Sequence, residues 1–189
     1  MILLVRHGRT ALNAQGRLQG RLDEPLDVEG ERQATAIGRA LGRVDAVITS
    51  PLARARSTAA HIDGPVEVDE RWIELDYGTL DGMATKDLDP EVWRGWRTDV
   101  DFVPAGGESI AALYVRVRTA LEDRVTDAAT RTIAVVTHVS PIKAAVAWAL
   151  AAPPGLAWHT HLDQASITRI SIGANGPVLH GFNDVCHLI

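Results

Sequence analysis

Two histidines and two arginines in this chain have the chemistry that phosphate handling requires. They are Arg6, His7, Arg54 and His138. Arginine offers a planar fork of N–H donors that matches phosphate oxygens, and it stays charged at any relevant pH. Histidine can be neutral near pH 7, so one ring nitrogen can attack phosphorus while the other donates to a backbone carbonyl. If these residues meet in one cleft, they predict a phosphoryl-transfer site.

A proton donor is the next requirement, because the oxygen that leaves phosphorus must be protonated. Glu74, in the segment RWIELDYG, is the leading candidate. Asp76 and Asp81 lie close by in the sequence and remain alternative carboxyls that could shape the site.

The elements that must position these side chains follow from the hydrophobic pattern. Short apolar runs alternate with longer helical segments, which is typical of a sheet with helices packed on its faces. We expect an α/β fold, a three-layer sandwich with a mostly parallel central sheet and helices on both faces. The expected strands cover residues 2–5, 46–49, 132–137, 167–172 and 178–182; the expected helices cover residues 26–41 (with Gly42 as C-cap), 51–62, 91–97 and 109–125, and another begins at residue 141.

Three of these strands, at residues 2–5, 46–49 and 132–137, can bring the two histidines and two arginines together. Helical crossovers make such strands parallel, so their carboxyl ends share one edge of the sheet, where open α/β sheets bind ligands. Ser50-Pro51 and Ser140-Pro141 are each predicted to start a helix, with serine as the N-cap. The free N–H groups of both helices would then face the same crevice, which suits an anion.

Composition narrows the class of protein. The 189 residues suggest one domain, which we place at 1–189, and an apolar fraction of 46% can supply its core. The net charge of −5 argues against broad nucleic-acid binding, so an anion site must gather arginines locally. No run approaches the roughly 18 apolar residues that span a bilayer. Cys186 is the only cysteine, so no internal disulfide can form, and a cytoplasmic location is expected.

Six sequence blocks occur in an order that resembles one known family. The order matches the histidine phosphatase superfamily, also called phosphoglycerate mutase-like, over most of the chain from residue 2 to about 145. The blocks are VRHGRTALN (5–13), GRLQGRLDEPLDVEG (16–30), TSPLARARSTA (49–59), DERWIELDYGTLDG (69–82), PAGGES (104–109) and VVTHVSPIK (135–143).

The resemblance implies a role for each of the four residues named first. His7 would be the nucleophile and would form a phosphohistidine. Arg6 and Arg54 would hold the phosphoryl oxygens, and His138 would donate to them. The neighbouring cations would keep His7 neutral by like-charge repulsion. Gly8 would let the substrate approach the backbone closely.

The resemblance extends to three further residues. Asn13 matches a position whose amide also binds phosphate, Gln19 lies near the pocket mouth, and Glu74 matches the proton donor. The expected partner is a small phosphorylated metabolite, with no metal, no cofactor, no nucleic acid and no membrane; a homodimer is left open. His159 and His161 alternate as on one strand face, but no third metal ligand is evident.

One departure from the family pattern stands beside His138. Many relatives have glycine after this histidine, whereas this chain has Val139 and Ser140. The variant THVSPIK, with HLDQASIT at residues 161–168, most resembles the acid phosphatase domain fused to ribonuclease H in some actinobacterial proteins. Valine leaves the backbone N–H available, but its side chain would narrow the pocket.

The leading functional hypothesis is a metal-independent phosphomonoester phosphatase, in which water resolves the phosphohistidine. The alternative is a phosphoglycerate mutase-type transferase, which usually carries a longer, basic insertion. Here residues 83–106 form a short cap or lid segment with few basic residues. A third hypothesis is a binding protein whose catalytic site has lost its activity. It is disfavoured because every expected catalytic residue is present. The physiological substrate is not specified by the sequence.

Overall fold

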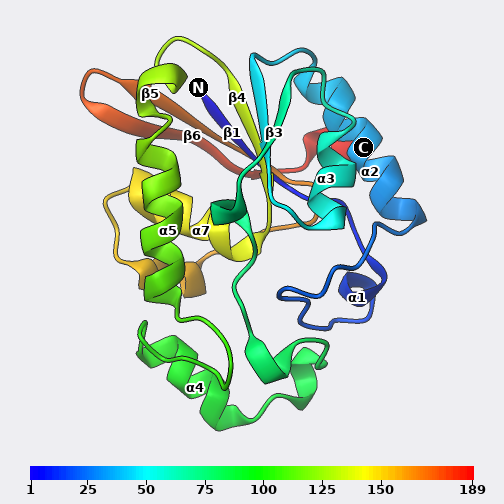
Figure 1. Cartoon of the computed structure of the whole chain (residues 1–189), viewed down its shortest axis with the longest axis vertical. Coiled ribbons are helices and arrows are strands. Elements are labelled where there is room, and N and C mark those ends of the chain that lie inside the picture. Colours follow the sequence, from blue (N-terminus) through cyan, green and yellow to red (C-terminus); the bar gives the residue numbers. More distant parts are fainter.

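The computed structural model describes residues 1–189 and is built on one six-stranded sheet (Figure 1). The strand order is β3-β2-β4-β1-β5-β6. Neighbours among the first four of these are parallel, while β5 runs antiparallel to both β1 and β6. The strands are β1 (Ile2–Arg6), β2 (Ala46–Thr49), β3 (Val66–Val68), β4 (Ile133–Thr137), β5 (Ile167–Gly173) and β6 (Gly176–Asp184).

Seven α-helices and five short 3₁₀ turns surround the sheet. The α-helices are α1 (Ala11–Ala14), α2 (Val28–Leu41), α3 (Ala53–Ala59), α4 (Pro90–Thr98), α5 (Ile110–Glu122), α6 (Val125–Ala128) and α7 (Val139–Ala149). The 3₁₀ turns are η1 (Glu70–Trp72), η2 (Gly78–Leu80), η3 (Thr85–Asp87), η4 (Pro154–His159) and η5 (Cys186–Leu188).

Alternating residues of β1 enter two separate cores, because successive side chains of a strand point to opposite faces. Ile2 and Leu4 belong to the core that α5 and α7 cover. Leu3 and Val5 belong to the core that α2 and α3 cover. Both pairs are buried, so β1 is sandwiched between helices (Figure 1). The expected three-layer α/β fold with a mostly parallel sheet is confirmed.

The sequence located most elements but misplaced several helix starts. α3 begins at Ala53 after Leu52, and α7 begins at Val139 after His138, so neither Ser50 nor Ser140 is an N-cap. The Ser-Pro prediction was wrong for both helices. Residues 109–125 do not form one helix either: Ser109 caps α5 as expected, but α5 ends at Glu122 and α6 is separate.

Strand β3 was not expected, and its sequence explains why. Val66, Glu67 and Val68 are all exposed at the edge of the sheet, so they lack the apolar run that marks a buried strand. The predicted C-cap of α2 is present, since Gly42 adopts a φ of 59° there. A residue without a Cβ takes this left-handed conformation at little cost.

Residues 83–106 pack against the rest of the chain mainly through aromatic rings. This segment holds η3 and α4, and α4 lies beyond the sheet, below α5 in Figure 1. Trp96 is buried, and its ring contacts those of Tyr77 and Trp158 at centroid distances of 5.4 and 6.5 Å. Motion of this segment as a lid stays a prediction. None of the helices is long and apolar enough to cross a bilayer.

Candidate active site

The carboxyl end of β1 carries Arg6 and His7 to the edge of the sheet at which the parallel strand β4 also ends. The backbone of His7 is fixed on both sides, since its N–H donates to Thr137 and its carbonyl accepts from Ala165. These contacts hold the turn that follows β1 against the end of β4.

Gly8 packs tightly against α2 and α3. A Cβ at Gly8 would lie 2.4 Å from the carbonyl oxygen of Gly30 in α2. The glycine therefore permits close packing of the α2 backbone, and a close approach of the substrate at this residue stays a prediction. Its N–H donates to Thr58 Oγ1 in α3, which anchors the turn to the helix layer.

The ring of His7 is held in one tautomer. Its Nδ1 lies 2.7 Å from the carbonyl oxygen of Gly8, which can only accept, so Nδ1 carries the proton. Its Nε2 accepts from Nε of Arg54 at 3.3 Å and is therefore unprotonated. Burial, followed by the charges of Arg54 and Arg6, holds the pKa of His7 well below its usual range. The ring is neutral at pH 7, as a nucleophile must be, with burial as the larger cause.

Arg54 reaches the site from α3 and is almost fully buried, with 1% of its surface exposed. Its guanidinium donates to the carbonyl oxygens of Leu22 and Gly20 at 2.6 and 2.8 Å. Gly20 has a φ of 49°, and a Cβ there would collide with Asp81. The loop that follows α1 thus aims two carbonyls at the guanidinium and fixes its position. Arg56, two residues later, is exposed on the outer face of α3.

Arg6 is held from the other side of the site. Its Nη1 donates to the carbonyl oxygen of Leu162 at 2.5 Å, and its buried Nε has no partner. The next residue, Asp163, exchanges two hydrogen bonds of 2.7 and 2.8 Å with the side chain of Asn183 in β6. Desolvation lowers the pKa of Arg6 to about 10, so the side chain remains charged at neutral pH.

The second histidine stands next to the first. The rings of His7 and His138 meet edge to face with centroids 5.0 Å apart. His138 Nε2 lies 2.7 Å from Ser50 Oγ, while its buried Nδ1 has no partner. Ser50 Oγ also accepts from the N–H of Leu52. His138, at the end of β4, is thus tied to Ser50, at the end of β2.

Glu74 occupies the N-terminus of α7. Its Oε1 accepts from the N–H groups of Leu75 and Ser140, and its Oε2 accepts from Val139. The predicted free N–H groups of this helix are therefore already engaged by a carboxylate. The start of α3 is similar, because Ala53 donates its N–H to Asp23. The expectation of free donors was therefore wrong for α7, and at α3 one of the expected donors, the N–H of Ala53, is already engaged.

A cavity of about 220 Å³ opens at the point where these side chains meet. Six of the seven predicted site residues line it: Arg6, His7, Asn13, Gln19, Arg54 and Glu74. The seventh, His138, is not part of the wall, but its ring contacts that of His7. Three arginines face one carboxylate in the wall, so the cavity is locally cationic although the protein is acidic.

Two side-chain amides, those of Asn13 and Gln19, also lie in the cavity wall. Asn13 Oδ1 accepts from the backbone and hydroxyl of Thr10, which leaves the amide N–H groups free to donate. Gln19 is buried and its Oε1 lacks a partner. Arg17 and Tyr77 also line the cavity, although no signal in the sequence separates them from surface and packing residues.

The alternative carboxyls stand outside the cavity wall. Asp76 pairs with Arg21, and Asp81 accepts the backbone N–H of Arg21. Burial raises the pKa of Asp81. No group of three or more His, Cys, Asp or Glu side chains is placed to hold a metal ion. His161 is paired with Asp163 instead.

Comparison with known proteins gives a consistent set of similarities. Bifunctional protein Rv2228c of Mycobacterium tuberculosis is 36% identical over an alignment of 185 positions, which covers 93% of this chain and 51% of that protein. The chain thus spans about half the length of this curated relative. Phosphoserine phosphatase 1 of Hydrogenobacter thermophilus is 33% identical, with 99% of this chain and 93% of that protein covered.

Two other similarities bear on activity and fold. A probable phosphoglycerate mutase, GpmB of Klebsiella pneumoniae, is 35% identical, with 99% of this chain and 94% of that protein covered. The crystal structure of phosphoserine phosphatase from Entamoeba histolytica with 3-phosphoglyceric acid superposes with a TM-score of 0.92 at 29% identity, covering 100% of this chain and 98% of that chain.

The family model for the histidine phosphatase superfamily (branch 1) matches residues 2–185. This match spans the cavity, both histidines and the sheet that positions them. The chain belongs to branch 1 of the histidine phosphatase superfamily.

Proposed function

We propose that this protein is a phosphomonoester hydrolase that acts on small phosphorylated metabolites through a phosphohistidine at His7. The observation that carries the proposal is the state of the His7 ring. Its Nε2 is unprotonated and lies beside the guanidinium of Arg54, at the wall of a cavity that Arg6 also lines. A nucleophilic nitrogen beside two fixed cations suits attack on a phosphoryl group.

In the first step, His7 Nε2 bonds to phosphorus as the bond from phosphorus to the leaving oxygen breaks. The ring becomes cationic, and the carbonyl of Gly8 accepts from Nδ1–H and stabilises that charge. Arg6, Arg54 and the amide of Asn13 donate to the phosphoryl oxygens, and His138, whose ring contacts that of His7, is the proposed fourth donor. Charge-assisted hydrogen bonds of this kind strengthen as charge develops on those oxygens.

In its protonated form, Glu74 supplies the proton for the leaving oxygen, and Oε2 is the atom best suited to carry it. Oε1 already accepts two N–H groups, whereas Oε2 accepts one and keeps a second lone pair. In the second step, water attacks phosphorus and gives its proton to Glu74. The phosphorus–nitrogen bond breaks, its electron pair returns to Nε2, and inorganic phosphate leaves.

The alternative is transfer of the phosphoryl group back to the substrate, as in a mutase. The similarity to a probable phosphoglycerate mutase favours it. The small extent of residues 83–106 argues against a mutase. Lys86, Arg94 and Arg97 are the only basic residues there, and α4 packs against η4 through its tryptophans. These residues offer little positive charge to retain a bisphosphate, so we favour hydrolysis.

The deciding experiment measures phosphate release from a panel of phosphorylated metabolites in the presence of EDTA, with and without bisphosphoglycerate. We expect release that needs neither a metal ion nor the bisphosphate. Activity that vanishes on chelation and returns with a divalent ion would contradict the metal-independent mechanism. Isomerisation of phosphoglycerate that depends on bisphosphoglycerate would establish the mutase instead.

A further inference from the structure

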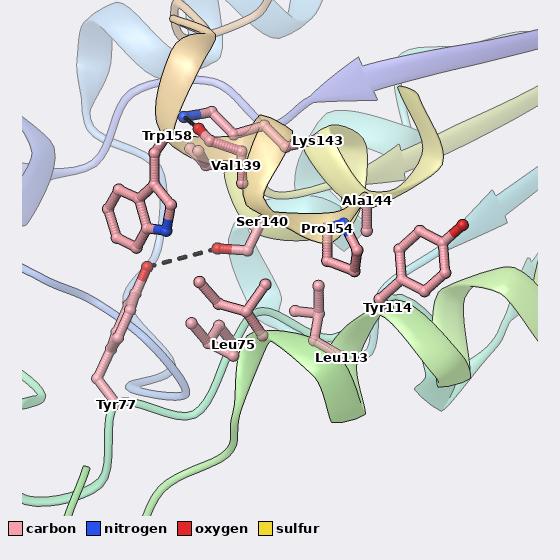
Figure 2. A pocket seen from close by; sticks show the side chains of 12 residues that line it. Leu75, Tyr77, Leu113, Tyr114, Val139, Ser140, Lys143, Ala144, Pro154 and Trp158 are labelled. Carbon is pink, nitrogen blue, oxygen red and sulfur yellow. Dashed lines mark hydrogen bonds between the residues drawn. The ribbon is translucent and has the colours of Figure 1, made fainter. Parts of the chain in front are cut away.

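A second, smaller cavity lies directly beside the cationic one. It has a volume of about 120 Å³, and its wall comes from the segment after Glu74, the first turns of α5 and α7, and η4 (Figure 2). Nine of the twelve residues that line it are hydrophobic. We call this cavity the apolar chamber.

The apolar chamber and the phosphate cavity share two wall residues, Tyr77 and Val139. Glu74 lines the phosphate cavity, and the next residue, Leu75, lines the chamber. The chamber therefore adjoins the proposed proton donor. A leaving group must lie on this side of phosphorus, because Glu74 protonates the oxygen that departs.

The polar groups of the chamber wall mostly bond to one another. The hydroxyl of Tyr77 faces that of Ser140 at 3.5 Å, as Figure 2 shows. Lys143 supplies the only charge in the wall, and its Nζ donates to the carbonyl oxygen of Ala157, which ties α7 to η4. The buried indole N–H of Trp158 has no partner and is left for one acceptor atom on a guest. The surface offered to a guest is thus largely apolar.

We propose that the apolar chamber is the leaving-group subsite and selects phosphomonoesters of small apolar alcohols. This inference rests on the proposed hydrolase function and names its substrate class. On the scale by which a cavity of ~150 Å³ holds benzene, the chamber accommodates a short alkyl chain or a single ring. Polar sugar or glycerol groups would lose hydrogen bonds to water there without replacement.

The test uses the n-alkyl phosphates from methyl to hexyl phosphate, with kcat/KM measured by released phosphate. The leaving oxygens of this series have similar basicity, so the chemistry at phosphorus stays nearly constant. Burial of each methylene should raise kcat/KM about fourfold until the chamber is full, after which the increase stops. Glycerol phosphate should be a poorer substrate than butyl phosphate.

Two variants fill the chamber from opposite walls. Ala144→Leu acts from α7, where the residue is buried, and Ala157→Leu acts from η4, where the residue is only half-buried and tolerates enlargement more easily. Each should remove the preference for butyl over methyl phosphate, so that the ratio of the two kcat/KM values falls to about one. Ala149→Leu, on α7 but outside the chamber wall, is the matched control and should keep the preference.

The outcomes separate the two proposals. Hydrolysis that requires His7 but shows equal kcat/KM along the alkyl series would overturn the chamber as a subsite and leave the hydrolase function standing. A preference that persists in both filling variants would overturn it as well. If no alkyl phosphate and no metabolite is hydrolysed in a manner that depends on His7, the hydrolase function itself fails.

Discussion

At the scale of single residues, the site depends on side chains whose donors are already committed before a phosphate arrives. Arg54 donates one N–H to His7 and two to the carbonyl oxygens of Gly20 and Leu22. A planar guanidinium has five N–H donors, so two remain for phosphoryl oxygens. The loop contacts fix the fork in place, which lowers the entropy lost when a phosphate binds.

Replacement of Arg54 by alanine should reduce kcat/KM by about 10²-fold or more, on the scale for loss of one transition-state donor. Arg56→Ala is the matched control, because Arg56 lies on the same helix but is exposed; it should stay within about twofold of the wild type. Steady-state kinetics on the two purified variants, with circular dichroism to verify folding, make the comparison. If Arg56→Ala lost most of its kcat/KM and Arg54→Ala lost little, Arg56 rather than Arg54 would be the phosphate-binding arginine of α3.

Most of the site residues could be predicted from the sequence because the family motifs fix their types and order. The contacts of these residues could not be predicted from the sequence. Nothing in the segment RWIELDYG shows that Glu74 accepts three backbone N–H groups, since two of these come from α7, about 65 residues later in the chain. Arg17 and Tyr77 were missed for a similar reason, because only tertiary packing places them at the cavity.

At the scale of elements, the turn after β1 is packed against α2 with no room to spare. Gly8→Ala would place a methyl group 2.4 Å from the carbonyl oxygen of Gly30, which is backbone and cannot rotate away. We expect a loss of about 1–3 kcal/mol in the free energy of unfolding, as for other overpacked sites, together with reduced activity as His7 shifts.

Gly155→Ala provides the control, because nothing lies within 4 Å of the added methyl group. Urea unfolding of both variants measures the difference in free energy. Equal stability of Gly8→Ala and wild type would show that the turn moves freely, and the packing role assigned to Gly8 would be wrong.

The elements themselves were predictable where the hydrophobic pattern was strong. β1, β2 and β4 are buried apolar runs, and their boundaries agree with the sequence within one residue. The Ser-Pro pairs gave the wrong helix starts, because tertiary contacts can override a local N-cap pattern. Ser50 bonds to His138, and Glu74 takes the capping role at α7 that Ser140 was expected to fill.

At the scale of the whole molecule, an acidic protein keeps two buried histidines neutral at its centre. Burial and neighbouring arginines hold the pKa values of His7 and His138 well below the usual range. In the unfolded chain both would titrate near their ordinary value of about 6.5. As the pH falls below that value, the unfolded state binds more protons than the folded state, so folding stability is lost.

The free energy of unfolding should therefore fall by up to about 1.4 kcal/mol per pH unit for each of these histidines as the pH drops below about 6.5. Urea titrations between pH 7.5 and 5 measure the slope. The double variant His7→Asn, His138→Asn lacks both titrating groups. The slope of its unfolding free energy against pH should therefore be smaller by the uptake of close to two protons, up to about 2.8 kcal/mol per pH unit. An unchanged slope in that variant would mean that neither histidine is held neutral by the fold.

The most direct test of the mechanism is the detection of a covalent phosphoryl group on His7. Glu74→Gln cannot protonate a leaving oxygen or activate water, but it leaves His7 Nε2 able to attack. An aryl phosphate has a good leaving group and needs little protonation, so this variant should accumulate phosphoenzyme. A rapid quench without acid, followed by intact mass spectrometry and peptide mapping, should find one phosphoryl group at His7, absent when His7→Ala is added. A phosphoryl group mapped to any other residue, or hydrolysis that survives His7→Ala, would contradict the mechanism at its first step.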